Sequence, residues 1–467
     1  MCGIFGIVSN EEAAQKIVLG IYDLQHRGEQ GAGIAVSDGK QIKEHKGPGL
    51  VTEIFNEKER EGIFQKCAGN FGIGHTLYST IGKTGEEKQP KTYQPLMGKF
   101  RGQSFALAHN GNLVDYEPLK KEAKEKGYTF QSEASDTEVI VSLISTSDEK
   151  DFITALRKIL PRLKGAFALT ILYKDKVIGV RDRCGIRPLC LGQGNSSFIL
   201  ASESCAFFTL GANFLNEVDP GEIVVLGKAG IEKRFLWTSN PTLNFCMFEY
   251  VYFARPDSKI AGQSVYFYRK HSAEILAQES PVEADMIMPV PESGRIYDNA
   301  YSWILKIPIE EGLFKNRYFS MKTFLTSRET DKRFLQRIKL HPLREVVHEK
   351  RVCITEDSLI RANVLPEVVA MLREKGAKEV HVRIFSAPIR YPCFLGIDLA
   401  SQVELVAASL NEEEIGKKIV QADSLHYISL EGMIRASGVA RERLCLGCFT
   451  GEYPVELPKN WNLRPPS

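Results

Sequence analysis

Short apolar runs bounded by turn residues recur through the first half of the chain. Such runs are typical of buried strands, and they occur at residues 3–8, 166–172, 177–182, 198–203 and 223–226. Between the first two of these runs, Ile17, Ile21 and Leu24 recur at helical spacing and predict a helix over residues 12–25. Many short strands with few helices predict a sandwich of packed sheets for this half.

The pattern changes near residue 283, where strands begin to alternate with helices. Residues 284–291 and 350–355 are predicted strands, and a helix is predicted from about residue 365 to residue 375. This alternation is typical of a parallel α/β sheet. A chain of 467 residues also exceeds the size of one ordinary core. We therefore expect a protein of mixed α/β and α+β class with domains at residues 1–238 and 239–467.

Composition narrows the classes of partner. With 60 basic and 58 acidic residues, the chain gives no reason to expect nucleic acid or an anionic membrane as a partner. No apolar stretch approaches a membrane span and the N-terminus lacks a secretory signal pattern, so we expect a cytoplasmic protein that acts on small molecules. Ten cysteines are too few for a disulfide scaffold in a chain of this length, and we expect them to be reduced.

Cys2 is the first candidate for chemistry. Removal of Met1 would place Cys2 at the N-terminus, where one residue supplies a thiol nucleophile and, in its own α-amino group, a base. The apolar run that follows would hold this terminus inside a core. The alternative is an ordinary first strand with a chance cysteine, and the short motif alone does not decide between the two.

Two later segments carry polar residues beside predicted elements. Asn110 and Gly111 follow a strand and form a dipeptide that turns readily, but an Asn amide and a Gly N–H at a strand end also make a two-donor oxyanion hole. Asp136 opens a helix that runs to about residue 144, where an acid is either a first-turn cap or a ligand-binding group. A glycine-rich turn is predicted at residues 26–33.

Five motifs together resemble, in order and in spacing, the glutaminase domain of N-terminal-nucleophile amidotransferases. They lie at residues 2–7, 24–28, 74–76, 109–112 and 135–138. The resemblance implies an αββα sandwich in which Cys2 attacks the glutamine side-chain amide, while Asn110 and Gly111 stabilise the oxyanion. The glutamine pocket that it implies contains Arg27, Thr76 and Asp136, of which Asp136 holds the substrate α-amino group.

One position departs from this pattern. The family has an arginine after its Gly-His-x motif, where it clamps the glutamine α-carboxylate, but this chain has Leu77. Loss of a charge-assisted contact is expected to weaken glutamine binding by about 1.5–3 kcal/mol. We therefore expect glutamine use to be weak or absent unless another cation replaces the arginine.

In the second half, Glu356 and Asp357 follow the strand predicted at residues 350–355. Acids at the carboxyl end of a parallel strand can hold ribose hydroxyls or Mg²⁺, although they also cap solvated turns. Segments at 289–294, 315–318, 339–340 and 355–361 resemble the type I phosphoribosyltransferase half of amidophosphoribosyltransferases. The resemblance implies that phosphoribosyl pyrophosphate (PRPP) is held by Glu356, Asp357, Ser358 and Arg361. The Mg²⁺ ligands that it implies are Ser293, Glu356 and Asp357.

The segment that wraps the 5′-phosphate in this family is altered here. Residues 361–364 read Arg-Ala-Asn-Val where the family has Arg-Gly-Thr-Thr, a change that removes two hydroxyl donors and a glycine. The acid before Asp357 is a glutamate, where the family has an aspartate. The family also has an arginine in the loop that follows residues 315–318, and this chain lacks that arginine unless Lys322 substitutes for it. These changes predict weaker binding of an anionic substrate.

Cys445 and Cys448 are the only cysteines separated by just two residues. A lone pair of this spacing fits zinc, an iron–sulfur cluster or no metal. The segments around this pair, Cys246 and Cys393 resemble the iron–sulfur branch of the same family, which implies that these four residues ligate one [4Fe–4S] cluster. The cysteines expected to be small buried hydrophobes are Cys67, Cys184, Cys190, Cys205 and Cys353.

The resemblance implies a transferase that forms 5-phosphoribosylamine, pyrophosphate and glutamate from PRPP and glutamine, the first step of purine nucleotide synthesis. It also implies a homo-oligomer, either a tetramer or a dimer, with purine nucleotides as effectors. Two alternatives stay open. One is a regulatory, ligand-binding or scaffold relative that keeps the fold and the cluster with impaired catalysis, and the other is a free-standing glutaminase, against which Leu77 argues.

Overall fold

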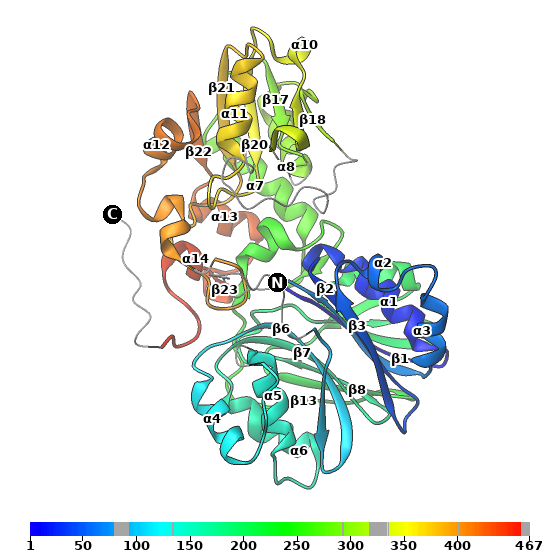
Figure 1. The fold of residues 1–467 in the computed structure, drawn as a ribbon. Helices are drawn as coiled ribbons and strands as arrows, with labels where there is room; N and C mark the ends of the chain where they lie inside the picture. Colours follow the sequence, from blue (N-terminus) through cyan, green and yellow to red (C-terminus); the bar gives the residue numbers. More distant parts are fainter. Residues whose placement is uncertain are drawn as a thin grey trace.

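The computed structural model describes residues 1–78, 93–132, 135–291, 294–316, 334, 336–399 and 401–458. The first half of the chain forms two antiparallel sheets packed face to face, with helices on both outer sides (Figure 1). The last of these strands, β13, ends at Leu236, close to the domain boundary predicted at residue 238.

The two sheets have seven and six strands. The first sheet is, in spatial order, β11 (Asn213–Glu217), β9 (Cys190–Gln193), β10 (Ser197–Ala201), β1 (Gly3–Ser9), β4 (Phe71–Leu77), β2 (Gly31–Ser37) and β3 (Ile42–Pro48). The second sheet is β13 (Gly230–Leu236), β12 (Glu222–Gly227), β8 (Lys176–Arg181), β7 (Gly165–Tyr173), β6 (Gln103–Leu113) and β5 (Leu96–Phe100).

Alternating side chains divide each sheet between two cores. Ile4 of β1 packs with Ala106 of the second sheet in the core between the sheets. Phe5 of β1 faces the other way and packs with Ile17 of α1 (Ala13–Asp23). Outside the second sheet, Phe105 and its neighbours pack with α5 (Asp136–Ser145) and α6 (Phe152–Ile159). These layers confirm the predicted αββα sandwich. The remaining helices here are α2 (Val51–Ile54), α3 (Arg60–Lys66) and α4 (Glu117–Glu125).

The second half is built on a four-stranded parallel sheet, as the alternating pattern predicts. Its strands are β17 (Met286–Pro289), β20 (Arg351–Glu356), β21 (Glu379–Ile384) and β22 (Ser424–Tyr427). One apolar cluster joins α7 (Val265–Glu279), α8 (Arg295–Leu305) and α13 (Leu430–Ser437), while a second joins the sheet to α11 (Leu365–Glu374). The upper part of Figure 1 is this domain.

Short elements complete the second half and connect it to the first. They are β14 (Phe245–Cys246), η4 (Glu249–Phe253), β15 (Lys259–Ile260), β16 (Gln263–Ser264), β18 (Leu313–Lys315), β19 (Leu340–Pro342), α10 (Arg344–Val347), η6 (Gln402–Glu404), η7 (Val406–Ala408), α12 (Glu412–Glu414), η8 (Ile415–Val420), η9 (Arg441–Arg443), β23 (Leu444–Cys445) and α14 (Gly447–Thr450). The two-residue strands β14 and β23 pair in parallel, so the segment after the first domain lies beside the end of the chain.

Two predicted turns are wrong. Asn110 and Gly111 lie inside β6, which continues to Leu113 and pairs with β7 over its whole length. Likewise, Gly31 and Gly33 belong to β2, so the predicted turn at residues 26–33 is shorter than expected. Glycine is accepted in both strands because neighbouring atoms approach the backbone closely, leaving no space for a Cβ.

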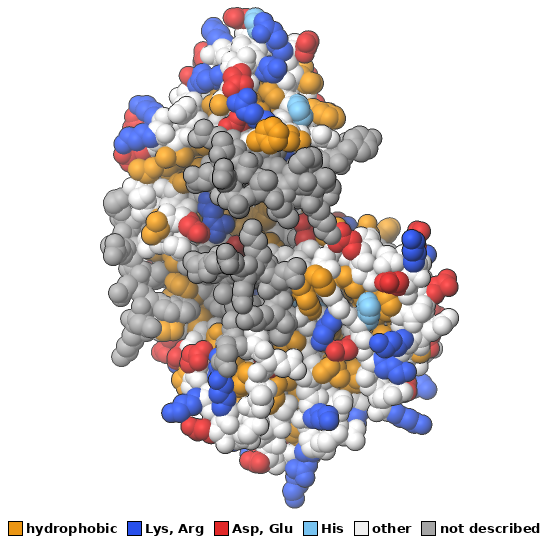
Figure 2. All heavy atoms as spheres, in the orientation of Figure 1, with side chains coloured by type: hydrophobic (Ala, Val, Ile, Leu, Met, Phe, Trp, Pro, Cys, Tyr) orange, Lys and Arg blue, Asp and Glu red, His pale blue; other side chains and the backbone are white. Residues whose placement is uncertain are grey.

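Basic and acidic side chains are interspersed over the described part of the visible face (Figure 2). Among the described residues, no helix is long and apolar enough to cross a membrane. The five cysteines expected to be small buried hydrophobes are all buried.

Candidate active site

β1 carries the N-terminus into the centre of the protein. This strand lies between β10 and β4 and pairs with both in antiparallel register. Met1 and Cys2 are buried, with exposed fractions of 1% and 7%. The start of the chain lies where the two halves meet (Figure 1). The fold therefore places the predicted nucleophile at the boundary between the domains.

Asn110 lies beside Cys2, and a hydrogen bond from Cys2 orients the Asn110 side-chain amide. The Cys2 backbone N–H donates to Asn110 Oδ1 at 3.2 Å. With the oxygen occupied, Asn110 Nδ2 is left buried and without a hydrogen-bond partner among the described residues. A buried unpaired donor costs about 1–3 kcal/mol, so it is retained where a ligand supplies the acceptor. An oxyanion formed by attack of Cys2 is such an acceptor.

Gly111 follows in β6 with a φ of +148°. A Cβ at this position would lie 2.0 Å from the Ala166 carbonyl oxygen, so only glycine fits. From the second domain, Gly396 packs on Gly111, and the Phe394 carbonyl accepts a hydrogen bond from Asn112 Nδ2 at 2.9 Å. The segment around residue 394 therefore covers the predicted oxyanion hole.

Asp136 is held in place beside the nucleophile. Its carboxylate accepts from the Leu113 N–H at 2.9 Å and from the Thr137 N–H at 2.7 Å. Burial first, and to a smaller extent the Asp136 carboxylate, raise the pKa of the Cys2 thiol. Asp136 is thus fixed by two backbone N–H groups, and its charge reaches the Cys2 thiol.

Two buried histidines lie next to this site. His75 Nε2 lies 3.3 Å from the His109 carbonyl oxygen, and His109 Nδ1 lies 3.0 Å from Thr137 Oγ1. Burial lowers the pKa of His75 to about 3 and also lowers the pKa of His109. Neither ring replaces the missing arginine as a cation at neutral pH.

Thr76 and Leu77 lie at the end of β4 opposite the first strand. The Thr76 hydroxyl accepts from the Gly3 N–H at 3.2 Å and donates to the Leu24 carbonyl at 3.3 Å. Its role in this geometry is to anchor the strand that carries Cys2. The Leu77 side chain is buried, with 8% exposed, and brings no charge to the site.

Arg27 is part of a buried network that the sequence does not reveal. Its Nε donates to the Cys2 carbonyl at 3.0 Å, and its two terminal nitrogens contact Glu249 at 3.0 and 2.9 Å. Arg27 also bonds to Glu203, and Arg187 lies 3.4 Å from Glu249. All four side chains are fully buried, with two positive and two negative charges. Arg27 thus shapes the pocket by holding Cys2, with its guanidinium already occupied.

Tyr78 connects this site to a second one. The Cys2 thiol donates to the Tyr78 carbonyl oxygen at 3.6 Å. Tyr78 also lines an open cavity of about 560 Å³ whose walls come from both domains. Residues 26–29 form part of its wall from the first domain, and residues 356–365 and 397–399 contribute from the second. The two candidate sites are therefore adjacent.

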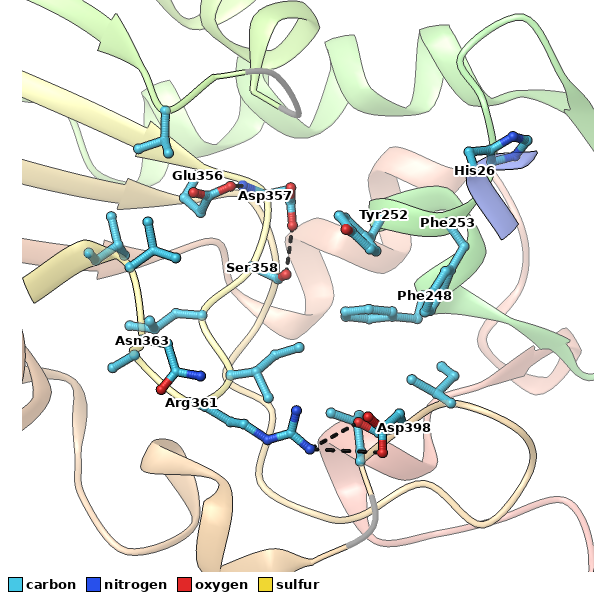
Figure 3. A pocket seen from close by; sticks show the side chains of 18 of the residues that line it. His26, Phe248, Tyr252, Phe253, Glu356, Asp357, Ser358, Arg361, Asn363 and Asp398 are labelled. Atoms are coloured by element: carbon cyan, nitrogen blue, oxygen red, sulfur yellow. Dashed lines mark hydrogen bonds and ion pairs between the residues drawn. The ribbon is translucent and has the colours of Figure 1, made fainter. Parts of the chain in front are cut away.

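The acidic pair lies on the second-domain side of this cavity (Figure 3). Glu356 ends β20, as the pattern of a parallel sheet predicts, and its carbonyl accepts from the Phe385 N–H at 3.0 Å. Asp357 accepts a hydrogen bond from the Ser358 hydroxyl at 2.6 Å. Across the cavity, burial and the nearby Asp357 carboxylate raise the pKa of Tyr252 to about 12. The acids thus face an aromatic wall that includes Tyr252.

Arg361 is ion-paired in this structure. It contacts Glu404 at 2.8 Å and the Asp398 carboxylate at 3.9 Å, both from the segment that follows β21. Figure 3 shows the contact with Asp398. A ligand phosphate would have to compete with these carboxylates for its guanidinium. The acids that line the described cavity are Glu29, Glu356, Asp357 and Asp398, and the basic residues are His26, Arg27, Lys339 and Arg361.

Ala362 adopts a φ of +50°, in the left-handed region that favours glycine. We expect Ala362→Gly to raise the free energy of unfolding by up to about 1 kcal/mol, because glycine has no Cβ to strain this conformation. Urea unfolding measures the change. The matched control is Ala370→Gly inside α11, which should lower it by about 1 kcal/mol. Equal losses in both variants would contradict the strain at Ala362.

The four predicted cluster cysteines come together at the domain boundary. Cys246 and Cys445 are paired residues of β14 and β23, and the Cys448 carbonyl accepts from the Arg390 and Tyr391 N–H groups at 3.0 Å. Burial raises the pKa of the Cys246 thiol to about 11, with a further contribution from Cys393. Burial likewise raises the pKa values of Cys445 and Cys448, and the other cluster cysteines raise them further.

A set of four cysteines is the ligand type that a [4Fe–4S] cluster requires. Among the described residues, no group of three histidine, cysteine or acidic side chains is close enough to share one metal ion. In a [4Fe–4S] cluster each thiolate binds a different iron, so the sulfurs need not converge on one point. Arg187 lies near Cys246, Cys393 and Cys445, where its charge would balance an anionic cluster.

Two predicted residues, Ser293 and Lys322, lie outside the part that the structure describes. Conversely, sequence reasoning missed Glu203 and Glu249 as partners of Arg27, and Arg187 as a second partner of Glu249. Glu249 carried one available signal, because it is an acid inside an otherwise apolar and aromatic run.

A family model described as a glutamine amidotransferase domain matches residues 84–209. The chain is 43% identical to the amidophosphoribosyltransferase of Methanocaldococcus jannaschii over 98% of both proteins. It is 42% identical to that of Bacillus subtilis, over 98% of this chain and 94% of the relative. A solved structure of glutamine PRPP amidotransferase from B. subtilis, complexed with ADP and GMP, gives a TM-score of 0.89 at 41% identity over 98% of both chains.

The geometry around Cys2 and the matched domain model define the class, a glutamine amidotransferase domain joined to a parallel-sheet domain. The relatives narrow it further. The chain belongs to the amidophosphoribosyltransferase family.

Proposed function

We propose that this protein is a glutamine-dependent amidophosphoribosyltransferase. It would form 5-phosphoribosylamine, pyrophosphate and glutamate from PRPP and glutamine, the first step of purine nucleotide synthesis. The observation that carries the proposal is Tyr78, whose carbonyl binds the Cys2 thiol while the same residue lines the cavity of the acidic pair. Ammonia released at Cys2 would then enter the second site without crossing bulk solvent.

The glutaminase half follows from residues around Cys2. After removal of Met1, the α-amino group of Cys2 would accept the thiol proton. The buried setting favours a neutral amine, because burial lowers the pKa of the present Met1 α-amino group to about 5. Attack on the amide carbon would place the oxyanion beside Asn110 Nδ2 and Gly111, and Asp136 would hold the substrate α-amino group.

The second half-reaction uses the cavity between the domains. Glu356 and Asp357 would hold the ribose hydroxyls, and with Ser293 they are the residues that would bind Mg²⁺. When bound, Mg²⁺ neutralises charge on the pyrophosphate leaving group. Ser358 and Arg361 would contact the 5′-phosphate, with Arg361 released from Glu404 and Asp398.

We expect one [4Fe–4S] cluster on Cys246, Cys393, Cys445 and Cys448. The pairing of β14 with β23 and the positive charge of Arg187 support this ligand set. Protein purified without oxygen should contain about four irons and four sulfides per chain. A Cys393→Ala variant should lose the iron, whereas Cys190→Ala, which changes a buried cysteine outside the set, should retain it. Full iron content in Cys393→Ala would contradict the assignment.

Expectations about effectors and oligomeric state come from the relatives. A B. subtilis structure of this family is complexed with ADP and GMP, so we expect purine nucleotides to regulate this protein as well. We also expect a cytoplasmic homo-oligomer, a tetramer or a dimer, with no nucleic acid or membrane as partner.

The nitrogen donor tests the proposal. Protein with its cluster intact is given PRPP and Mg²⁺ with either glutamine or ammonium, and pyrophosphate is followed. Pyrophosphate from both donors supports the full function, whereas pyrophosphate from ammonium alone places the defect in the glutamine site. In that case Leu77→Arg should restore glutamine use. Pyrophosphate from neither donor overturns the proposal.

A second candidate is a regulatory or scaffold relative with impaired catalysis. It is favoured by the combination of Leu77, the strained Ala362 and an Arg361 occupied by two carboxylates. Such a protein would bind PRPP or nucleotides, with a rise in melting temperature, but would release no pyrophosphate.

A further inference from the structure

Asp298 is a buried carboxyl that the proposed reaction does not use. It lies in the first turn of α8 with 1% of its surface exposed, and its Oδ1 is hydrogen-bonded to the Thr355 hydroxyl. Among the described residues, its Oδ2 has no hydrogen-bond partner. A buried carboxyl oxygen without a hydrogen bond lowers the stability of the fold, which suggests that Asp298 has a functional role.

The surroundings of this pair are apolar. Cys353 and Thr355 alternate along β20 and therefore point to the same face of the sheet. Cys353 belongs to the cluster that also contains Tyr297 and Tyr301 of α8. Burial raises the pKa of Asp298 to about 8, and the only opposing contribution comes from the Thr355 hydroxyl. Two apolar side chains would fill this place at lower cost.

The pair touches the elements that hold the acids of the cavity. Thr355 directly precedes Glu356, and its carbonyl accepts from the Val290 N–H at 3.2 Å. A Cβ added to Gly294 would lie 3.1 Å from Asp298 Oδ2. Asp298 therefore ties the end of β20 to the segment after β17, in which Val290 lines the cavity.

We infer that Asp298 is a positioning residue for Glu356 and Asp357, which acts through Thr355 and must be neutral while PRPP is bound. The inference rests on the proposed function, because it takes the magnesium complex of PRPP as the ligand. A neutral carboxyl shares a hydrogen bond with Thr355 without adding charge. An ionised one adds a negative charge behind two acids that already face an anionic ligand, which weakens its binding.

Other titratable groups lie near Asp298. Tyr297 and Tyr301 are on the same helix and Cys353 is on β20. One shell further out, Arg269 and Asp357 lie near Tyr297, and Arg383 lies near Tyr301 and Cys353. Burial raises the pKa of Cys353 to about 12 and raises the pKa values of both tyrosines. Asp298 is therefore the member of this set that changes charge near pH 8.

Calorimetric binding of magnesium–PRPP to the full-length protein, from about pH 6.5 to about pH 9.5, tests the inference. In the wild type, Kd should rise by about tenfold per pH unit above about pH 8. Asp298→Asn replaces the carboxyl by a neutral amide of the same shape, so its Kd should stay level over that range. Asp285→Asn is the matched control, because Asp285 is ion-paired with Arg351 outside the cavity, and it should follow the wild type.

The pH dependence of thermal stability is a second test of the Asp298 protonation state. A carboxyl with a raised pKa costs stability progressively as the pH rises from its unfolded pKa, about 4, to its folded pKa, about 8. Asp298→Asn should therefore melt at a higher temperature than the wild type at pH 8. This advantage should disappear as the pH falls toward about 4.

Each outcome decides a separate point. If Kd rises equally with pH in the wild type and in Asp298→Asn, the inference fails while the proposed function stands. No PRPP binding at any pH overturns both. If Asp298→Asn does not fold, wild-type calorimetry in two buffers of different ionisation enthalpy decides. Uptake of about one proton per PRPP above about pH 8 is expected, and no uptake overturns the inference.

Discussion

Cys2→Ala should abolish glutamate release and leave ammonium-dependent pyrophosphate release intact. The glutaminase rate should fall by about 10⁴-fold or more, because no other group can form the covalent intermediate. The second site does not contain Cys2, so ammonium can still enter it directly. Glutamate and pyrophosphate are measured separately, at high glutamine concentration because Leu77 weakens glutamine binding.

The matched control for Cys2→Ala is Cys67→Ala, which changes a buried thiol in the core that packs against α1. This variant should keep both activities. Glutamate release at the wild-type rate in Cys2→Ala would exclude Cys2 as the nucleophile.

Glu249→Gln should lower the free energy of unfolding by about 3–5 kcal/mol. The buried network balances Arg27 and Arg187 against Glu203 and Glu249, and removing one negative charge leaves an uncompensated positive charge. Glutaminase activity should fall as well, because Glu249 holds Arg27, and Arg27 holds the Cys2 carbonyl. Urea unfolding measures the first effect, and glutamate release measures the second.

A surface ion pair provides the comparison. Glu122 contacts Arg162 with about a third of its side chain exposed, so Glu122→Gln should cost less than about 1 kcal/mol. If Glu249→Gln is no more destabilising than Glu122→Gln, the network does not hold the domains or the nucleophile.

Much of the fold is encoded in local patterns. Short apolar runs predicted the sandwich, and alternation of strands and helices predicted the parallel sheet. The tight turn predicted at Asn110 is absent. The Asn-Gly dipeptide is common in turns, but here β7 pairs with β6 along its length, past both residues. Pairing of this kind is a tertiary effect that overrides local turn preference.

The sequence predicted the reactive residues of the candidate site better than it predicted the residues that hold them in place. Cys2 and Asn110, far apart in the sequence, are joined by a hydrogen bond. The partners of Arg27 and Arg361 come from segments far away in the chain, namely Glu249 and Glu404. Such pairs leave no periodic signal in the sequence, so only the folded chain reveals that both guanidinium groups are already engaged.

The central claim is that two half-reactions in one chain are coupled through adjacent sites. The most direct test measures glutamate and pyrophosphate in one reaction, with cluster-containing protein, glutamine, PRPP and Mg²⁺. The account predicts equal amounts of the two products throughout, and little glutamate when PRPP is left out. Glutamate formed at the same rate with and without PRPP, or with no pyrophosphate beside it, would contradict the coupling.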